Sequence, residues 1–140
     1  MERADSFGAS GGESTTVLLV EDNEVFRETL EFLLDVTPDV QVVGTVGDGN
    51  AALEACKAVR PDVVLMDYRL PGTDGVETTA AIRGASPGSS VVVLTAGVEP
   101  GEEEALHKAG AVILLTKDSE FDEIVRTIRS IAGLRAGASE

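Results

Sequence analysis

The sequence contains little cysteine and few basic residues. Cys56 is the only cysteine among 140 residues, so an internal disulfide is excluded and a reducing compartment is compatible with the chain. It falls within an alanine-rich helical pattern, which favours a buried structural residue over a catalytic thiol. The chain has 11 Lys and Arg residues against 25 Asp and Glu, a net charge of −14. Phosphate backbones would repel such a surface, which argues against direct nucleic-acid binding by this domain.

Long apolar runs are also missing. No run approaches the roughly 18 residues of a membrane span, so we expect no membrane partner and a cytoplasmic location. Residues 1–14 are polar, rich in Gly and Ser, and without the apolar segment of a signal peptide, which predicts a flexible tail. The small and polar residues 135–140 predict a second tail. The 43% of hydrophobic residues then suits one globular domain over residues 15–134.

The apolar runs that are present are short and regularly spaced. Four of them are continuous, which predicts strands covered on both faces: residues 17–20, 63–66, 91–94 and 112–115. Residues 40–46 mix in polar side chains and predict an edge strand. A helical pattern follows each strand, and the last helix is predicted to begin at Ser119, with Asp122 completing a capping box. This alternation predicts the α/β class, a doubly wound parallel sheet with helices on both faces.

Polar side chains follow four of the predicted strands. Glu21 and Asp22 come after the first strand, Asp67 after the third, Thr95 after the fourth and Lys117 after the fifth. In sheets of this class, ligands bind beyond the carboxyl ends of the strands, near the point where the strand order reverses. We therefore expect three carboxylates, one hydroxyl and one ammonium group at one edge of the sheet.

These groups together predict phosphoryl chemistry. Three neighbouring acids repel one another unless a cation compensates, and Mg²⁺ suits a site with few carboxylates and room for a phosphate. Lys117 adds a compact positive charge that can pair with Asp67 or with phosphate oxygens, and Thr95 can donate its hydroxyl to the same oxygens. The pattern is that of a carboxylate nucleophile that accepts a phosphoryl group.

Four segments carry a resemblance to a known family. They are VLLVEDN (17–23), PDVVLMDYRLPGTDG (61–75), VVVLTAG (91–97) and GAVILLTKD (110–118). In this order and spacing they resemble the response-regulator receiver domain of bacterial two-component signalling, over about residues 16–134. The resemblance implies a five-stranded flavodoxin-like sheet of order 2-1-3-4-5. It also implies a domain that mediates only its own phosphoryl transfer and dephosphorylation, without being an enzyme for other substrates.

The resemblance implies a role for each residue at the sheet edge. Asp67 would be the phosphoacceptor and a metal ligand, and Asp22 a direct Mg²⁺ ligand. Glu21 would act through a metal-bound water, and the backbone carbonyl of Arg69 would complete the protein ligands. Pro71 and Gly75 match the turn that follows the acceptor in the family. The implied phosphoryl donor is a phosphohistidine on a sensor histidine kinase or a phosphotransfer protein.

The switch residues partly depart from the family pattern. Thr95 would be the switch hydroxyl and Lys117 the phosphate-binding lysine. Leu114, however, stands where the family usually has Tyr or Phe, and the family often has an aspartate in place of Glu21. Asp118 after the lysine resembles receivers of the LuxR/FixJ-type helix-turn-helix regulators. The implied partners are an output domain or a downstream protein, and a second copy of the chain in a phosphorylation-dependent homodimer.

Other readings of the same residues remain open. Asp22 could be a helix N-cap, Thr95 an ordinary strand end and Lys117 a solvated loop lysine. The whole domain could be an unswitched receiver-like module that binds other proteins. A flavin carrier is disfavoured because the loop after the first strand is acidic and lacks glycine. An aspartate-nucleophile phosphatase would need a second acid two residues after Asp67, where this chain has Arg69.

Overall fold

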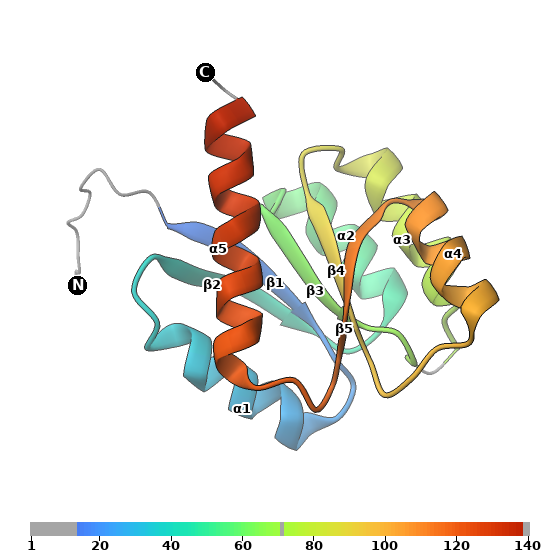
Figure 1. The fold of residues 1–140 in the computed structure, drawn as a ribbon, viewed down its shortest axis with the longest axis horizontal. Helices are drawn as coiled ribbons and strands as arrows, with labels where there is room; N and C mark the ends of the chain where they lie inside the picture. Colours follow the sequence, from blue (N-terminus) through green and yellow to red (C-terminus); the bar gives the residue numbers. More distant parts are fainter. Residues whose placement is uncertain (1–13, 71, 139–140) are drawn as a thin grey trace.

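The computed structural model describes residues 14–70 and 72–138, in which five strands alternate with five helices (Figure 1). The expected N-terminal tail, except for its last residue, and the role expected of Pro71 lie outside the described residues. The strands are β1 (Thr15–Val20), β2 (Val40–Val46), β3 (Val63–Asp67), β4 (Ser90–Thr95) and β5 (Ala111–Thr116). The helices are α1 (Glu24–Asp35), α2 (Gly49–Val59), α3 (Gly75–Ala85), α4 (Pro100–Ala109) and α5 (Phe121–Ala138).

The strands form one parallel sheet in the order β2-β1-β3-β4-β5, which confirms the predicted topology. After β1 the chain moves to one side for β2 and then returns to the other side for β3. The strand order therefore reverses between β1 and β3, and their carboxyl ends lie at the switch point. In register, Val20 lies opposite Met66, so the residues that follow the two strands emerge side by side.

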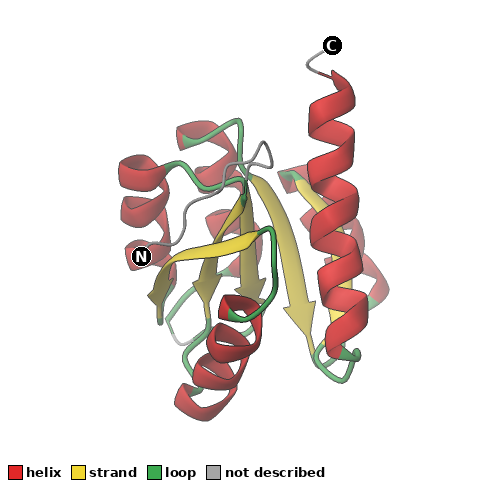
Figure 2. Cartoon of the chain, turned by 90° about the vertical axis from the view of Figure 1, so that its left-hand side faces the viewer, coloured by secondary structure: helices red, strands yellow, loops and turns green. Residues whose placement is uncertain are grey.

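Helices cover both faces of the sheet, with α1 and α5 on one face and α2, α3 and α4 on the other (Figures 1 and 2). Successive residues of a strand point to opposite faces. In β1, Val17 and Leu19 accordingly belong to the core under α1 and α5, whereas Leu18 and Val20 belong to the other core. All four are buried, which confirms the prediction of a doubly covered strand.

The fifth strand departs from the prediction of a doubly covered strand. Val112 and Ile113 are 49% and 37% exposed. The strand lies at the edge of the sheet, and its register against β4 shifts so that Val91 pairs with Ala111 but Val92 with Ile113. Val112 is thus an extra residue that disturbs the alternation of sides. The apolar run alone indicated a strand but not its edge position.

Both ends of the last helix also differ from prediction. It begins at Phe121 rather than Ser119, because the Ser119 hydroxyl bonds to the Thr116 hydroxyl at 3.1 Å instead of capping the helix. The predicted capping box with Asp122 is therefore wrong. The helix continues to Ala138, so residues 135–138, expected in a tail, belong to it. Among the described residues, no helix is both long and apolar enough to cross a lipid bilayer.

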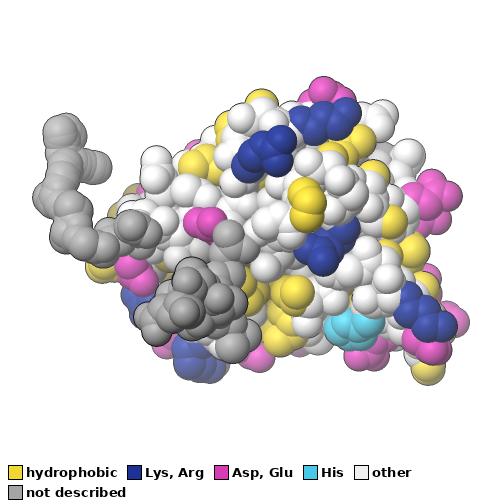
Figure 3. Space-filling view, turned by 90° about the horizontal axis from the view of Figure 1, so that it is seen from above, with side chains coloured by type: hydrophobic (Ala, Val, Ile, Leu, Met, Phe, Trp, Pro, Cys, Tyr) yellow, Lys and Arg dark blue, Asp and Glu magenta, His cyan; other side chains and the backbone are white. Residues whose placement is uncertain are grey.

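The face seen from above in Figure 3 mixes charges of both signs with apolar side chains. On the part of this face that the structure describes, basic side chains lie among acidic and apolar ones rather than in one broad patch. Nucleic-acid binding by electrostatic attraction needs basic side chains gathered on one face. The described part of this face shows no such gathering of basic side chains.

Candidate functional site

Three carboxylates meet at the carboxyl ends of β1 and β3. Asp67 is the last residue of β3 and is 4% exposed, and Glu21 directly follows β1 and is 2% exposed. Asp22 is exposed to solvent. One carboxylate oxygen of each residue lies within 4.8 Å of those of the other two. The parallel pairing of β1 with β3 thus brings together acids that are 46 positions apart in the sequence.

The loop between β1 and α1 fixes the orientation of Glu21. The Asn23 side chain caps α1 by accepting a hydrogen bond from the Phe26 amide at 2.9 Å. The backbone amide of Asn23 donates to Glu21 Oε2 at 3.0 Å, and the Arg27 guanidinium donates to the backbone carbonyl of Glu21 at 2.9 Å. The N-cap of α1 is therefore Asn23, and the reading of Asp22 as an N-cap is wrong. The Asp22 carboxylate remains available beside the other two acids.

Lys117 supplies a positive charge to this group. Its Nζ lies 3.0 Å from Glu21 Oε1 and 3.2 Å from Asp67 Oδ2. The Lys117 amide donates to the Thr95 carbonyl at 2.8 Å, which continues the β4–β5 ladder past the end of the strand and directs the side chain to the site. Partial burial works to lower the pKa of Lys117, but the close contact with the Glu21 carboxylate and the negative charge of Asp67 raise it overall. The reading as a solvated loop lysine does not fit these contacts.

Glu21 shows the electrostatic cost of the site. Burial raises the pKa of its carboxyl above the ordinary value, and the charge of Asp67 adds to this effect. The Asn23 amide and Lys117 oppose the shift without cancelling it. Within the described residues, the buried Oε1 atom accepts no well-aligned hydrogen bond, although the ammonium of Lys117 contacts it as an ion pair. A buried oxygen with spare acceptor capacity beside two further carboxylates fits a hard divalent cation such as Mg²⁺.

Thr95 ends β4 next to this site and is 3% exposed. Its hydroxyl donates to the Gly97 carbonyl at 2.9 Å and accepts from the Gly97 amide at 3.0 Å. Both bonds are made within the loop that leads to α4. The hydroxyl is therefore used locally in this state, and it can reach a ligand at Asp67 only after these two bonds are exchanged for others.

Arg69 and Tyr68 connect the site to α4, a link that the sequence analysis missed. The Arg69 amide donates to Asp67 Oδ1 at 3.2 Å, and the Arg69 guanidinium lies 3.8 Å from Glu102 Oε1 in the first turn of α4. Partial burial raises the pKa of the Tyr68 hydroxyl, and its hydrogen bond to the Glu102 carboxylate raises it further. The packing of Tyr68 against Gly75, where a Cβ atom would lie 2.6 Å from the ring, holds this arrangement.

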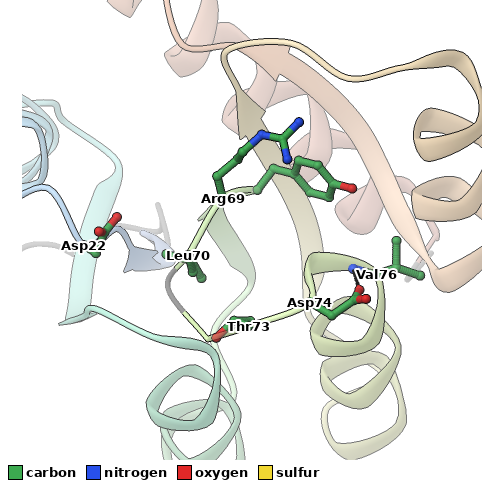
Figure 4. A pocket seen from close by; sticks show the side chains of 7 residues that line it. Asp22, Arg69, Leu70, Thr73, Asp74 and Val76 are labelled. Atoms are coloured by element: carbon green, nitrogen blue, oxygen red, sulfur yellow. Dashed lines mark hydrogen bonds between the residues drawn. The ribbon is translucent and has the colours of Figure 1, made fainter.

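A cavity of about 490 Å³ opens beside the carboxylates (Figure 4). Asp22 lies on one side of it, and Asp74 and Val76 lie on the other. Asp74 Oδ1 accepts from the amides of Val76 and Glu77 at 2.8 and 3.1 Å, so it is held as the N-cap of α3. The remaining lining residues are Tyr68, Arg69, Leu70 and Thr73. The exposed acid thus faces a cavity with room for a small anionic group.

Leu114 lies outside the group of charged side chains. It is part of β5, opposite Val93, and it is partly buried against the core under α3 and α4.

The single cysteine is also remote from the site. Cys56 is fully buried on α2, and burial raises the pKa of its thiol to about 11, which confirms a structural rather than a reactive residue.

Comparisons with known proteins agree with the fold. Residues 17–129 match the family model described as the response regulator receiver domain. The chain belongs to the receiver-domain family. It is 39% identical over 120 residues to the "Probable transcriptional regulatory protein NarL" of Mycobacterium tuberculosis, covering 86% of this chain and 56% of that protein. The receiver thus spans about half the length of this relative.

Solved receiver structures are similar as well. The signal receiver domain of NarL from M. tuberculosis superposes with a TM-score of 0.81 at 39% identity, covering 86% of this chain and 98% of the other. A LuxR-family response regulator from Aurantimonas gives a TM-score of 0.79 at 30% identity, covering 86% and 87%. These relatives confirm the predicted resemblance to receivers of LuxR-type regulators.

Proposed function

We propose that this receiver accepts a phosphoryl group on Asp67 from a phosphohistidine of a sensor histidine kinase or phosphotransfer protein. The P–N bond of the donor breaks as a bond forms between phosphorus and an Asp67 carboxylate oxygen. The observation that carries the proposal is the convergence of Glu21, Asp22 and Asp67 within 4.8 Å, with Lys117 Nζ 3.2 Å from Asp67 Oδ2. A buried carboxylate beside a fixed ammonium and a cavity suits a nucleophile for phosphorus.

Mg²⁺ is the metal that this donor set fits. Asp22 and Asp67 would bind it directly, Glu21 through a metal-bound water, and the Arg69 carbonyl would supply a further oxygen. When bound, the metal would neutralise negative charge on the phosphoryl oxygens. The backbone amide of Arg69 would keep the Asp67 carboxylate oriented. The ion pair with Asp67 would keep the Lys117 ammonium where it can pair with the transferred phosphoryl group.

The relay of the signal would follow from changes at Thr95 and Lys117. A phosphoryl group on Asp67 offers new acceptors for the Lys117 ammonium and for the Thr95 hydroxyl. To reach it, Thr95 must give up its two hydrogen bonds to Gly97, which changes the loop before α4. This change would be read by an output domain or a downstream protein in the cytoplasm, or by a second copy of the chain in a phosphorylation-dependent homodimer.

The test is uptake of phosphoryl from acetyl phosphate, measured by intact mass. The wild type should gain one phosphoryl group only when Mg²⁺ is present, and Asp67→Asn should gain none. Asp74→Asn is a matched control, because it also lies by the cavity and asparagine still caps a helix. Equal labelling of wild type and Asp67→Asn would disprove the assignment of the phosphoacceptor.

The second candidate is an unswitched receiver that only binds other proteins. Leu114 favours it, because the usual aromatic residue of the switch is missing there. The same experiment separates the two functions when it is combined with a comparison of the loop between Thr95 and α4 before and after phosphoryl uptake. A binding module without a switch would take up no phosphoryl group, or would take it up without any change in the loop between Thr95 and α4.

A further inference from the structure

An aromatic ring contacts the ammonium group of the site. Lys117 Nζ lies 4.7 Å from the centre of the Phe26 ring, in addition to its contacts with Glu21 at 3.0 Å and Asp67 at 3.2 Å. This distance is within the range in which a cation is attracted to the face of an aromatic ring. The contact of Phe26 with Lys117 has no role in the function proposed above.

The ring is held in place independently of Lys117. The backbone amide of Phe26 donates to Asn23 Oδ1 at 2.9 Å, so the position of Phe26 in the first turn of α1 is fixed. Its side chain is partly buried and packs against the core under α1 and α5. The same Asn23 residue binds Glu21, so one short loop fixes both the carboxylate and the ring that meet the ammonium.

The ring differs from the other two neighbours of Lys117 in one respect. Phosphorylation changes the charge of Asp67, and a metal ion would compete for Glu21, so both carboxylate partners are altered when the site is used. The attraction of the Phe26 ring does not depend on either event. A lysine side chain has a flexible four-carbon stem, and that of Lys117 is 26% exposed, so it could otherwise turn to solvent.

We propose that Phe26 is a positioning residue that keeps the Lys117 ammonium at the phosphoryl site before and after phosphorylation. This inference rests on the proposed function, because the position of Lys117 matters only if the site takes a phosphoryl group. Phe26→Leu keeps an apolar side chain in the core but removes the ring face, whereas Phe26→Tyr keeps the ring. The two variants therefore separate the contact with the ammonium from packing.

The first measurement is the affinity of the whole chain for beryllofluoride in the presence of Mg²⁺, obtained by calorimetry. Phe26→Leu should weaken it about two- to fivefold, the range of a partly exposed cation–ring contact, and Phe26→Tyr should leave it nearly unchanged. In a Lys117→Met background, Phe26→Leu should have no further effect. An equal loss in both backgrounds, or no loss in either, would show that the ring acts only in packing and would overturn the proposal.

The second measurement does not require phosphoryl chemistry. In metal-free protein, the side-chain NMR signals of Lys117 next to the ammonium should be shifted by the ring in wild type and Phe26→Tyr but not in Phe26→Leu. Their assignment follows from their absence in Lys117→Met. Failure of the wild type to bind beryllofluoride would sink the proposed function and this role with it. A ring shift without coupling in the binding measurements would overturn the role of Phe26 alone.

Discussion

Glu21 carries much of the electrostatic cost of the site, because it is buried next to Asp67 and its pKa is raised. A carboxyl with a raised pKa in the folded state gives full stability below the unfolded value of 4.5, and this stability is lost as the pH rises through the folded value. In metal-free buffer, Glu21→Gln should therefore unfold at a higher temperature than wild type at pH 7, and the difference should vanish below pH 4.5. Thermal unfolding across this pH range checks it.

A matched control for this measurement is Glu28→Gln, which changes a solvent-exposed carboxylate of α1. It should leave the unfolding temperature nearly unchanged at both pH values, because surface substitutions away from special contacts have small effects. If Glu21→Gln were instead less stable than wild type at pH 7, the ion pair with Lys117 would outweigh the cost of burying the acid.

The two acids after β1 should differ in their effect on metal binding. Asp22→Asn should weaken Mg²⁺ binding more than Glu21→Gln, because it removes the proposed direct ligand rather than the one proposed to act through water. Intrinsic fluorescence is poorly suited to this titration, because the chain has no Trp and Tyr68 is its only Tyr. Mg²⁺ binding is therefore measured by calorimetry. The opposite ranking would mean that the two acids have exchanged roles.

At the scale of elements, β5 and α4 determine how a change at Asp67 could spread. Leu114 of β5 has no polar tip, unlike the tyrosine common at its position, and burying a leucine is worth roughly 1.5–3 kcal/mol. We expect it to stay on the inner side in both states, so any coupling to α4 should be small at this position. Structures with and without beryllofluoride test this, and a large swing of Leu114 from exposed to buried would contradict it.

The elements themselves were largely predictable from the sequence. Four continuous apolar runs and one mixed run specified the strands, because parallel strands buried on both faces need such runs. The edge position of β5 was not predictable, because exposure of Val112 and Ile113 depends on a register shift against β4. The start of α5 was not predictable, because the hydrogen bond of the Ser119 hydroxyl to the Thr116 hydroxyl leaves no signal in the sequence.

In the site, too, some features could be predicted from the sequence and others depend on contacts between elements. Parallel strands end at one edge, so the proximity of Asp67 to Glu21 and Asp22 followed from topology alone. The contacts of Tyr68 and Arg69 with Glu102 depend on where α4 packs against the loop after β3. The contact of Lys117 with Phe26 depends on where the first turn of α1 lies relative to the loop after β5. Side-chain contacts between elements of this kind leave no periodic signal in one sequence.

For the whole molecule, metal binding at one edge should appear as global stability. A ligand that binds only the folded state stabilises it by about 2.7 kcal/mol at a concentration of 100 times its Kd. Saturating Mg²⁺ should therefore raise the unfolding temperature of the wild type, and Asp22→Asn should lose most of the increase. An increase of equal size in the variant would indicate that Mg²⁺ acts elsewhere on this acidic chain.

Helix α5 can amplify a small rotation at its first turn into a larger displacement at its last turn. It begins four residues after Lys117, and the buried side chains among its residues 121–133 are Ile124, Val125 and Ile128. Its last turns stand beyond the edge of the sheet (Figures 1 and 2). With 18 residues it is about 27 Å long, so a tilt of about 5° at its base would move its far end by about 2 Å. A small rotation next to the proposed phosphoryl site would thus become a displacement at the opposite end of the domain.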